Sequence, residues 1–286
     1  MAEFDNIGII GLGLLGGSIC LAARKSGVAK KVLGYTRTPG TLEKAKNTGL
    51  IDKGFSDISR FIEESDFIIL CAPVFSNFRY INDIVKTKPE VFFTDVGSTK
   101  NNIVKLVDGQ FKGQHNFIGS HPIAGSEKKG FDFSSEDMFK GRVVILTPGE
   151  KSRPQALSKL KTFWETLGSS TVVMDAGKHD EILAYTSHLP HSVIFALCMS
   201  LKNKISDSQS VLGFGTGLKD TTRIGGSDPQ IWTEIFIDNK TNILSAIEEF
   251  KTALNDLQSL IEKEDRVSLE EYLKNAKKTK EFIEKK

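Results

Sequence analysis

The 286-residue sequence predicts an α/β fold with a doubly wound sheet, followed by an all-α domain. Short β-branched runs alternate with helix-like segments from residue 6 to about residue 174, as they do in a parallel sheet with helices on both faces. No comparable strand follows, and the chain has helical periodicity from about Lys178 onward. This length suits two domains that each bury a core of their own, and we place them at residues 1–175 and 176–286.

The expected strands and helices follow one another along the first domain. Strands are expected at IGII, KVLGY, FIILCAP, VFFTDV, RVVIL (residues 142–146) and STVVM (residues 170–174), with a further one around Phe117 and Ile118. Helices are expected at residues 14–26, 41–47, 77–86 and 100–107, with one more that ends near Leu167. Strands separated by helices of this length are typical of βαβ units, so the sheet should be parallel.

The second domain should consist of helices alone. They are expected at residues 181–204, near residues 228–236, from Asn239 and from Ser268. In the helix from Asn239, apolar residues recur at steps of four and three in one seam, formed by Ile243, Ile247, Phe250, Leu254, Leu257 and Ile261. The seam requires a partner helix, either within an internal bundle or across a two-fold homodimer interface.

Charge and cysteine content indicate the class of protein. The 38 Lys and Arg residues nearly balance the 36 Asp and Glu residues, for a net charge of +2, so we expect small-molecule partners and no nucleic acid. Cys20, Cys71 and Cys198 lie far apart in apolar sequence, which is typical of reduced thiols in a cytoplasmic protein. The longest uninterrupted apolar run, residues 67–74, is too short to span a membrane, and we expect no membrane association.

A glycine motif follows the first expected strand and opens the first expected helix. In IGIIGLGLLGGSI, the first glycine of GxGxxG permits a tight turn, the second lets the backbone approach a pyrophosphate, and the third packs the helix on the strand. The N-terminus of the helix then faces the phosphates with its partial positive charge. We therefore predict a Rossmann-type dinucleotide site. Its expected contacts are Gly11, Leu12, Gly13, Leu14, Leu15, Gly16, Cys71, Ala72 and Pro73.

The residues after the second strand bear on the choice of cofactor. VLGY is followed by Thr36, Arg37 and Thr38, with no carboxylate. An acidic residue there would bind the ribose 2′-hydroxyl of NAD and repel a 2′-phosphate. Because hydroxyl groups and an arginine instead offer donors and positive charge to the phosphate, we expect NADP to be favoured over NAD. The alternative is that Arg37 stacks on the adenine, in which case either cofactor would fit.

A histidine stands in the Gly/Pro-containing segment GSHPIAG. His121 follows the expected strand around Phe117, so it should lie near the carboxyl ends of the sheet, where open α/β folds bind ligands. Ser98, in TDVGSTK, follows another strand and should lie in the same region. A neutral imidazole can take the proton of a substrate hydroxyl while hydride leaves the same carbon. We predict that His121 and Ser98 are catalytic; the alternative is a structural histidine bound by loop backbone.

The helical half contains a cluster of histidines in SHLPHS. His188 and His191 are three residues apart on one helical face, and Pro190 implies that the helix begins or kinks there. His179 and Asp180 lie upstream, which makes a metal site conceivable. No carboxylate stands at ligand spacing beside the histidine pair, so we expect no metal.

A second polar cluster is GTGLKDTTRIGGSDPQIW. Lys219 and Arg223 lie one helical turn apart and are suited to an anionic substrate, because the Arg223 guanidinium can hold a carboxylate in bidentate fashion. The alternative is an ordinary helix ion pair between Asp220 and Arg223.

In this order, the motifs resemble those of the prephenate/arogenate dehydrogenase family of tyrosine biosynthesis. The resemblance runs from about Ile7 to Leu257 and rests on the glycine motif, FIILCAPV, TDVGSTK, GSHPIAGSEKKG, SHLPHS and GLKDTTRIGGSDPQIW. It implies an N-terminal Rossmann-type domain, a C-terminal all-helical dimerisation domain and an active site in the cleft between them. The implied reaction is oxidative decarboxylation, of prephenate to 4-hydroxyphenylpyruvate or of arogenate to tyrosine, with hydride transfer to NAD(P)+.

The resemblance also implies roles for single residues. His121 would accept a hydrogen bond from the ring hydroxyl, and Ser98 would help to orient it. His191 and Arg223 match substrate-side residues, with Arg223 on the ring carboxylate. Further expected substrate contacts are Ser126, Glu127, Ser187 and Lys219. NAD-using members carry an acidic residue where this sequence has Thr36 and Arg37, which is closer to the NADP-using pattern.

Three other functions remain open at this point. A β-hydroxyacid dehydrogenase shares the domain plan but uses a catalytic lysine of the helical half, for which Lys202 and Lys219 are available, and it does not require His121. A non-catalytic NADP-binding sensor and a structural dimerisation module both leave the polar set of Ser98, His121, His191 and Arg223 unexplained.

Overall fold

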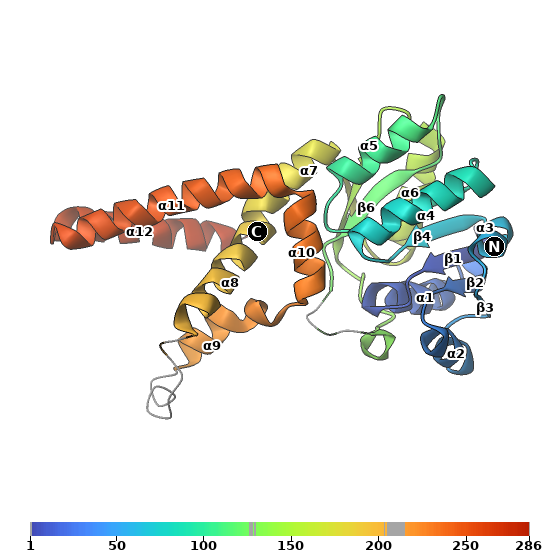
Figure 1. Cartoon of the computed structure of the whole chain (residues 1–286), viewed down its shortest axis with the longest axis horizontal. Coiled ribbons are helices and arrows are strands. Elements are labelled where there is room, and N and C mark those ends of the chain that lie inside the picture. The colour runs from blue at the N-terminus through green and yellow to red at the C-terminus, as the bar shows by residue number, and fades with distance from the viewer. Residues whose placement is uncertain (1, 126–127, 129, 203, 205–214, 286) are drawn as a thin grey trace. The chain divides into compact units, whose positions relative to one another are not determined.

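Figure 1 shows the protein as a computed structural model, which describes residues 2–125, 128, 130–202, 204 and 215–285. The chain divides into two compact units, Met1–Lys240 and Thr241–Lys286. The first unit contains both sheets and the helices up to residue 238, and the second is a pair of helices. Each unit is described below by itself.

The first sheet is parallel and has the strand order β3-β2-β1-β4-β5. Its strands are β1 (Phe4–Ile10), β2 (Ala29–Tyr35), β3 (Lys53–Phe55), β4 (Phe67–Leu70) and β5 (Phe92–Asp95). The order reverses between β1 and β4, so the crevice at their carboxyl ends is where a doubly wound sheet binds its ligand. The sequence analysis had predicted this sheet, although not the three-residue strand β3.

Helices cover both faces of this sheet because its strands are apolar on both sides. Successive residues of a strand point to opposite faces, and accordingly Phe67 and Phe92 belong to one buried cluster while Ile68 and Phe93 belong to the other. The first cluster contains side chains of α1 and α6, and the second contains side chains of α3, α4 and α5. These helices are α1 (Leu14–Ser26), α2 (Pro39–Asn47), α3 (Ile58–Glu64), α4 (Val74–Thr87), α5 (Asn101–Gln110) and α6 (Pro154–Thr166).

A second, three-stranded sheet follows the first. It consists of β6 (Ile118–Pro122), β7 (Val143–Pro148) and β8 (Ser170–Val173), with β6 and β7 antiparallel and β7 and β8 parallel. A bridge between Phe93 and Phe117 connects it to the edge of the first sheet. The sequence had predicted a parallel sheet, and the antiparallel pairing of β6 with β7 differs from it. Periodicity indicates that a strand is present, but it does not indicate which strand lies next to it.

The position of His121 corrects the sequence-based expectation. This residue lies inside β6, opposite Ile145 of β7, and not in a loop beyond the strand. Pro122 lies opposite Val144, while the next residue, Ile123, donates its N–H to the carbonyl of Val143. Pro122 therefore occupies a position whose N–H would point away from β7, so the proline removes no ladder hydrogen bond and the strand continues through it.

The helical part of the first unit begins with one continuous helical run that changes its pitch. It consists of α7 (Ala176–Leu183), a π-helical turn (Ala184–His188) and α8 (Leu189–Leu201). Pro190 has no N–H for the carbonyl of Thr186, four residues earlier, so the regular hydrogen-bond pattern cannot pass through this point. After it come α9 (Thr216–Thr222), a 3₁₀ turn (Arg223–Gly226) and α10 (Pro229–Asp238), whose first turn is capped by the Asp228 carboxylate.

The second unit is a helical pair. It contains α12 (Arg266–Glu284) and all but the first residue of α11 (Lys240–Glu262). The Tyr272 hydroxyl donates a hydrogen bond to the carbonyl of Ala253 and so connects the two helices. The seam expected from the sequence lies on α11, where Leu254 and Ile261 are 51% and 57% exposed in the single chain. This end of the seam is open to a further helix, whereas Ile243 near its start is 4% exposed.

Within the described residues, one helical run, Ala176–Leu201, is long and apolar enough by length and composition to cross a membrane. The same run carries His179 and Asp180, which are buried and hydrogen-bonded to β6 and α5 of the first unit. The expectation of no membrane span rested on uninterrupted apolar runs and did not consider this helix.

Candidate active site

The glycine loop joins β1 to α1 at the carboxyl end of the first sheet. Gly11 has a φ of +97°, and a Cβ there would lie 2.8 Å from the backbone of Cys71. A Cβ on Gly16 would lie 2.0 Å from the carbonyl oxygen of Gly11, so only glycine lets the helix pack this close to the loop. A Cβ on Gly13, by contrast, would meet nothing within 4 Å. Open space at the N-terminus of α1 fits the pyrophosphate of a dinucleotide.

A cavity of about 280 Å³ lies beside this loop. None of its lining residues is Asp or Glu, and Arg37 supplies a positive charge. Burial raises the pKa of the Tyr80 hydroxyl, and the positive charges of Arg37 and Arg79 act in the opposite direction. The lining residues are Gly11, Leu12, Gly13, Thr36, Arg37, Thr38, Thr41, Cys71, Ala72, Pro73 and Tyr80. The structure thus brings together most of the cofactor contacts expected from the sequence.

A second cavity, of about 390 Å³, continues from the glycine loop toward the helical part of the first unit. It is lined by Gly13, Leu14 and Leu15 on one side and by Asp228, Ile231 and other residues around α10 on the other. Ser98 lines it as well. Since the walls are mostly apolar, this space suits a flat ring that enters beyond the pyrophosphate.

A third cavity, of about 380 Å³, shares Ser98 and Ala124 with the second. It also contains His191 and Arg223, so three residues predicted from separate motifs meet around one space. Among the described residues, no ion pair joins Asp220 to Arg223, and the guanidinium is exposed at the cavity. The lining residues are Ser98, Ala124, Gly125, Lys128, His191, Arg223, Ile224, Ser227, Asp228, Ile231 and Trp232.

His191 is held by two contacts. Its ring stacks on the Trp232 indole, with centroids 3.7 Å apart and an interplanar angle of 22°. Its Nδ1 lies 2.9 Å from the carbonyl oxygen of Ser187, which can only accept, so Nδ1 carries the hydrogen. Burial lowers the pKa of His191, so the ring is neutral at neutral pH and Nε2 is an acceptor. Ser187 therefore serves the site through its carbonyl.

A buried ion pair shapes the loop that presents Ser98. The Asp95 carboxylate accepts hydrogen bonds from the Lys100 ammonium and, at 2.8 Å, from the backbone N–H of Gly97. Both side chains are almost completely buried. A buried carboxylate that binds both ends of residues 97–100 fixes this loop and with it the position of Ser98 at the two cavities.

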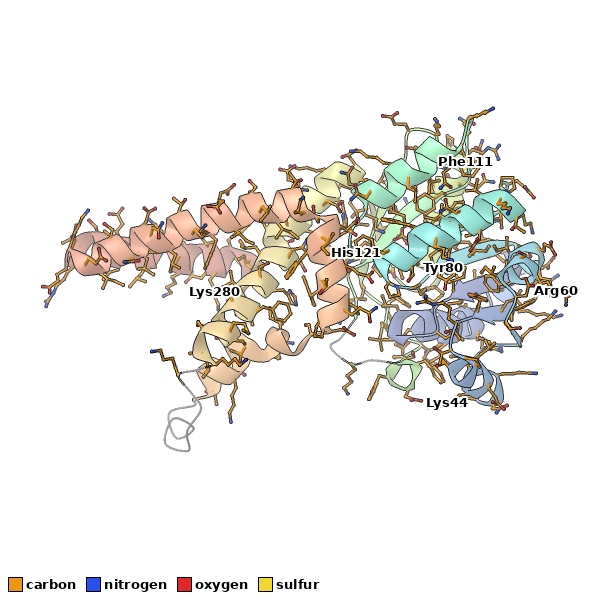
Figure 2. The ribbon with its side chains drawn as sticks, in the orientation of Figure 1. Lys44, Arg60, Tyr80, Phe111, His121 and Lys280 are labelled. Atoms are coloured by element: carbon orange, nitrogen blue, oxygen red, sulfur yellow. The ribbon has the colours of Figure 1, made fainter. Side chains whose placement is uncertain are left out.

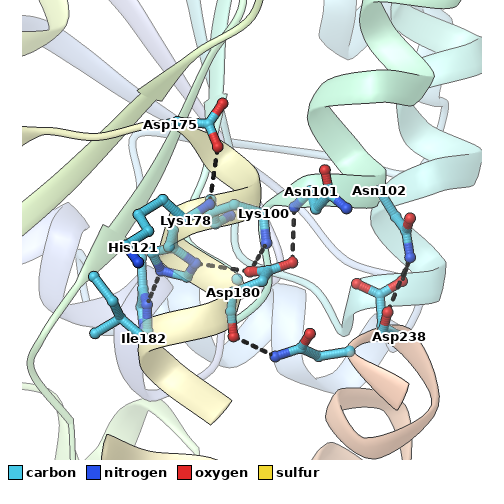
Figure 3. A network of polar contacts seen from close by, with 12 residues as sticks. Lys100, Asn101, Asn102, His121, Asp175, Lys178, Asp180, Ile182 and Asp238 are labelled. Atoms are coloured by element: carbon cyan, nitrogen blue, oxygen red, sulfur yellow. Dashed lines mark hydrogen bonds and ion pairs between the residues drawn. The ribbon is translucent and has the colours of Figure 1, made fainter. Parts of the chain in front are cut away.

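His121 lies on β6 in a different contact network (Figures 2 and 3). It does not line the three cavities, but the residue as a whole is partly exposed, and it precedes the lining residues Ala124 and Gly125 by a few positions. Its Nδ1 lies 2.8 Å from Nε2 of His179. Burial of His121 disfavours its charged form and lowers its pKa well below 6.5. The nearby positive or potentially positive groups of His179, Lys100 and His188 lower this pKa further. The ring is therefore neutral at neutral pH.

Some predicted residues lie elsewhere. Ser126 and Glu127 are outside the described residues. Lys219 is exposed and lines none of the described cavities, and the same holds for Lys202. The two lysines named for a lysine-dependent β-hydroxyacid dehydrogenase mechanism therefore do not lie at these cavities. Gly16 acts in packing and not as a lining residue.

Sequence reasoning missed part of the site. Trp232, Asp228 and Ile231 line the third cavity, and the helix-capping pattern DPQIW was the available signal for them. His179 and Asp180 had been weighed only as metal ligands. Both oxygens of Asp180 instead accept backbone N–H groups, and no group of three or more potential ligands among the described residues is placed to hold a metal.

Two family models match the chain. "Prephenate dehydrogenase, nucleotide-binding domain" matches residues 19–173, and "Prephenate dehydrogenase, dimerization domain" matches residues 175–275. The glycine loop lies just before the first matched segment, so its assignment rests on the geometry above. The domain boundary inferred from the sequence stays a prediction, since the compact units of the structure divide at residue 240 for reasons of packing.

Known proteins resemble the chain over nearly its whole length. Prephenate dehydrogenase of Bacillus subtilis is 32% identical, over 96% of this chain and 74% of the relative. Cyclohexadienyl dehydrogenase of Zymomonas mobilis is 30% identical, over 98% of this chain and 96% of the relative. The crystal structure of prephenate dehydrogenase from A. aeolicus in complex with hydroxyphenyl propionate and NAD+ has a TM-score of 0.91 and 36% identity, with 98% of each chain covered. From its fold, its motifs and these matches, the chain belongs to the prephenate dehydrogenase family.

Proposed function

We propose that this protein is a nicotinamide-dependent dehydrogenase that oxidises and decarboxylates prephenate, arogenate or both. The observation that carries the proposal is the position of Ser98, which lines the cavity of the glycine loop and also the cavity of His191 and Arg223. A cofactor ring and a substrate ring would meet across this residue. The names of the relatives, which include prephenate and cyclohexadienyl dehydrogenases, support these substrates.

The chain's own residues account for the chemistry. The bound cofactor supplies a hydride acceptor. Neutral His121 accepts the hydrogen bond of the ring hydroxyl and so stabilises the positive charge that develops on oxygen as hydride leaves the carbon. The electrons of the bond to the carboxylate then complete the aromatic ring, CO2 departs, and the hydroxyl retains its proton in the product. Because formation of an aromatic ring drives this loss, orientation is the main task of the protein.

Arg223 is suited to hold the substrate. Its guanidinium is exposed at the third cavity, where Lys128 and the neutral ring of His191 also lie. Both candidate substrates carry a ring carboxylate, for which a guanidinium provides two parallel donors. They differ in a side-chain keto or amino group, so a contact remote from Arg223 would choose between them.

The preference for NADP over NAD is the second part of the proposal, and the lining of the first cavity supports it. This lining contains Thr36, Arg37, Thr38 and Thr41 and no acidic residue among those described. Hydroxyl donors and the Arg37 guanidinium suit a 2′-phosphate, whereas the ribose 2′-hydroxyl of NAD finds no carboxylate there.

Assembly as a cytoplasmic homodimer is the third part of the proposal. Large apolar side chains of the helical region are open in the single chain, among them Met199 of α8 (66% exposed) and Leu254 of α11. The matched dimerization model covers both helices. Burial of such faces against a second copy is the common solution for an apolar helix surface. Light scattering of the purified protein should give twice the chain mass.

The activity is tested by cofactor reduction. Purified protein is mixed with prephenate, arogenate or a simple hydroxyacid, each with NADP+ and with NAD+, and the reduced cofactor is followed by its ultraviolet absorbance. Turnover with prephenate or arogenate, and CO2 in equal amount, is the expected result. Turnover with the hydroxyacid alone, or reduction without CO2, would contradict the proposal.

A further inference from the structure

A buried histidine and carboxylate stand behind His121, and the reaction described above does not use them. His179 and Asp180 belong to α7 and are 0% and 1% exposed. Nε2 of His179 lies 2.8 Å from Nδ1 of His121, and Nδ1 of His179 lies 2.7 Å from Oδ1 of Asp180. The three side chains therefore form a chain of contacts from the first turn of α5 to β6. Figure 3 labels its two ends, His121 and Asp180.

Asp180 fixes the direction of hydrogen bonding in this chain of contacts. Its Oδ1 accepts the backbone N–H of Lys100 at 2.8 Å, and its Oδ2 accepts that of Asn101 at 2.9 Å. Both donors lie at the N-terminus of α5, where the helix dipole favours an anion. A carboxylate that receives N–H groups on both oxygens is an acceptor only. The hydrogen between Asp180 and His179 must therefore sit on Nδ1 of His179.

This assignment passes to the next ring. In the neutral form of His179, the hydrogen on Nδ1 leaves a lone pair on Nε2, and this form accepts from His121. His121 must then carry its hydrogen on Nδ1, and its own Nε2 is left as an acceptor. Without such a partner, a neutral imidazole exchanges between both tautomers, and in one of them Nε2 would present an N–H to a substrate hydroxyl.

We propose that His179 and Asp180 are positioning residues that hold His121 in the Nδ1–H tautomer, with Nε2 as the acceptor for the substrate hydroxyl. The inference rests on the proposed function for its consequence in catalysis. The tautomer itself is a property of the resting protein and can be measured without substrate.

The tautomer is read directly by nitrogen NMR of histidine-labelled protein at neutral pH. The chain has 5 histidines, and His121→Asn identifies the signal of His121 by its loss. The expected result is a neutral His121 ring protonated at Nδ1. A ring protonated at Nε2, or at both nitrogens, would overturn the proposal whether or not the protein turns over prephenate.

Catalysis is tested with Asp180→Asn, which keeps the shape of the side chain. An amide supplies one oxygen in place of two, so it cannot accept from Nδ1 of His179 and from both backbone N–H groups at once. The hydrogens of His179 and His121 are then no longer held on Nδ1. A misplaced tautomer of this kind lowers kcat by up to about 10⁴-fold in the serine-protease triad. We expect a loss of kcat on the order of 10²-fold or more, with KM and the cofactor Kd within about threefold of wild type. Loss confined to KM would overturn the role.

A second pair of variants separates positioning from folding. His179→Gln retains an acceptor for His121 and should keep more activity than His179→Phe, which has none. When His121→Asn is already present, His179→Phe should lower kcat little further, because its effect on kcat acts through His121. Equal losses for Gln and Phe, or full additivity with His121→Asn, would sink the proposal.

The chain supplies a matched control in a second histidine and carboxylate pair, in which the histidine is buried and the carboxylate is partly exposed. Nε2 of His115 lies 2.8 Å from Oδ1 of Asp108, away from the cavities described above. His115→Gln should lower the melting temperature and leave kcat within about twofold of wild type. A decrease of kcat in His115→Gln as large as that in His179→Phe would show that the effect is general destabilisation.

Discussion

The imidazole of His191 lies flat on the indole of Trp232, 3.7 Å between ring centroids. Such stacking contributes about 0.5–1.5 kcal/mol, so Trp232→Leu should raise the KM for substrate roughly 2- to 10-fold by releasing His191. Trp232→Phe keeps an aromatic face and should remain near wild type. Steady-state kinetics with a melting curve for each variant make the comparison. Equal KM values for the Leu and Phe variants would refute the role of the stack.

His121→Asn should lower kcat by about 10²- to 10⁴-fold, the usual contribution of a positioned acid or base. Cofactor affinity, measured by fluorescence titration, should stay unchanged, since His121 lines none of the cofactor cavities. The pKa of His121 lies well below 6.5, so wild-type kcat should be level from neutral pH down to 6.5 and fall only at lower pH, where the ring becomes protonated and can no longer accept. A decline centred at 6.5 or above would assign the titration to another group.

Arg223→Ala should raise KM about 10- to 100-fold, because a hydrogen bond to a charged group contributes about 1.5–3 kcal/mol. The change in kcat should be smaller. Lys219→Ala is the matched control, since this lysine is also cationic and lies near Arg223 in the sequence but lines no described cavity. If both substitutions raised KM alike, general electrostatic attraction and not a specific contact would explain the effect.

Replacement of Thr36 by Asp should reverse the cofactor preference. A carboxylate at this wall of the first cavity would bind the ribose hydroxyl of NAD and repel a 2′-phosphate. Arg37→Ala should weaken NADP more than NAD, by about 10-fold or more, through loss of a charge-assisted contact. The ratio of kcat/KM for the two cofactors is the measurement. An Arg37→Ala variant with an unchanged ratio would mean that Arg37 stacks on the adenine.

His188 should make stability depend on pH. Burial lowers its pKa from 6.5 to about 4, so protons bind the unfolded chain more readily than the folded one between these values. Stability from this source is complete above pH 6.5 and is lost as the pH falls toward 4. At about 1.4 kcal/mol for each unit of pKa, the loss approaches about 3 kcal/mol. Urea unfolding at several pH values should show a flatter dependence for His188→Gln; a parallel curve would contradict this.

The fold could be predicted largely because periodicity reports burial. The apolar runs of β1, β4 and β5 are buried on both faces. Short continuous apolar runs of this kind are typical of the buried strands of a parallel sheet. Pairing is a different matter. Whether β7 lies next to β6 or extends the first sheet depends on contacts between distant residues, which a single sequence does not display.

Parts of the site could be predicted where the backbone geometry permits only one type of residue, because that residue is then visible in the sequence. Gly11 and Gly16 are required by a positive φ and a close approach. The contact of His121 with His179, by contrast, joins residues 58 positions apart, and neither neighbourhood in the sequence indicates it. Trp232 was likewise hidden, because a tryptophan on a helix is more often part of a core than of a wall around a ligand.

The π-helical turn at Ala184–His188 sets the rotational phase of one helical run that supplies both halves of the site. Each residue advances an α-helix by about 100°, so the wider turn decides where α8 faces once α7 has been fixed against β6 and α5. Removal of a single residue from this turn would leave a good helix on each side. It would also rotate His191 away from Trp232 while His179 stayed in place. The substrate-side histidine and the histidine behind His121 would then no longer have the relative orientation that the site requires.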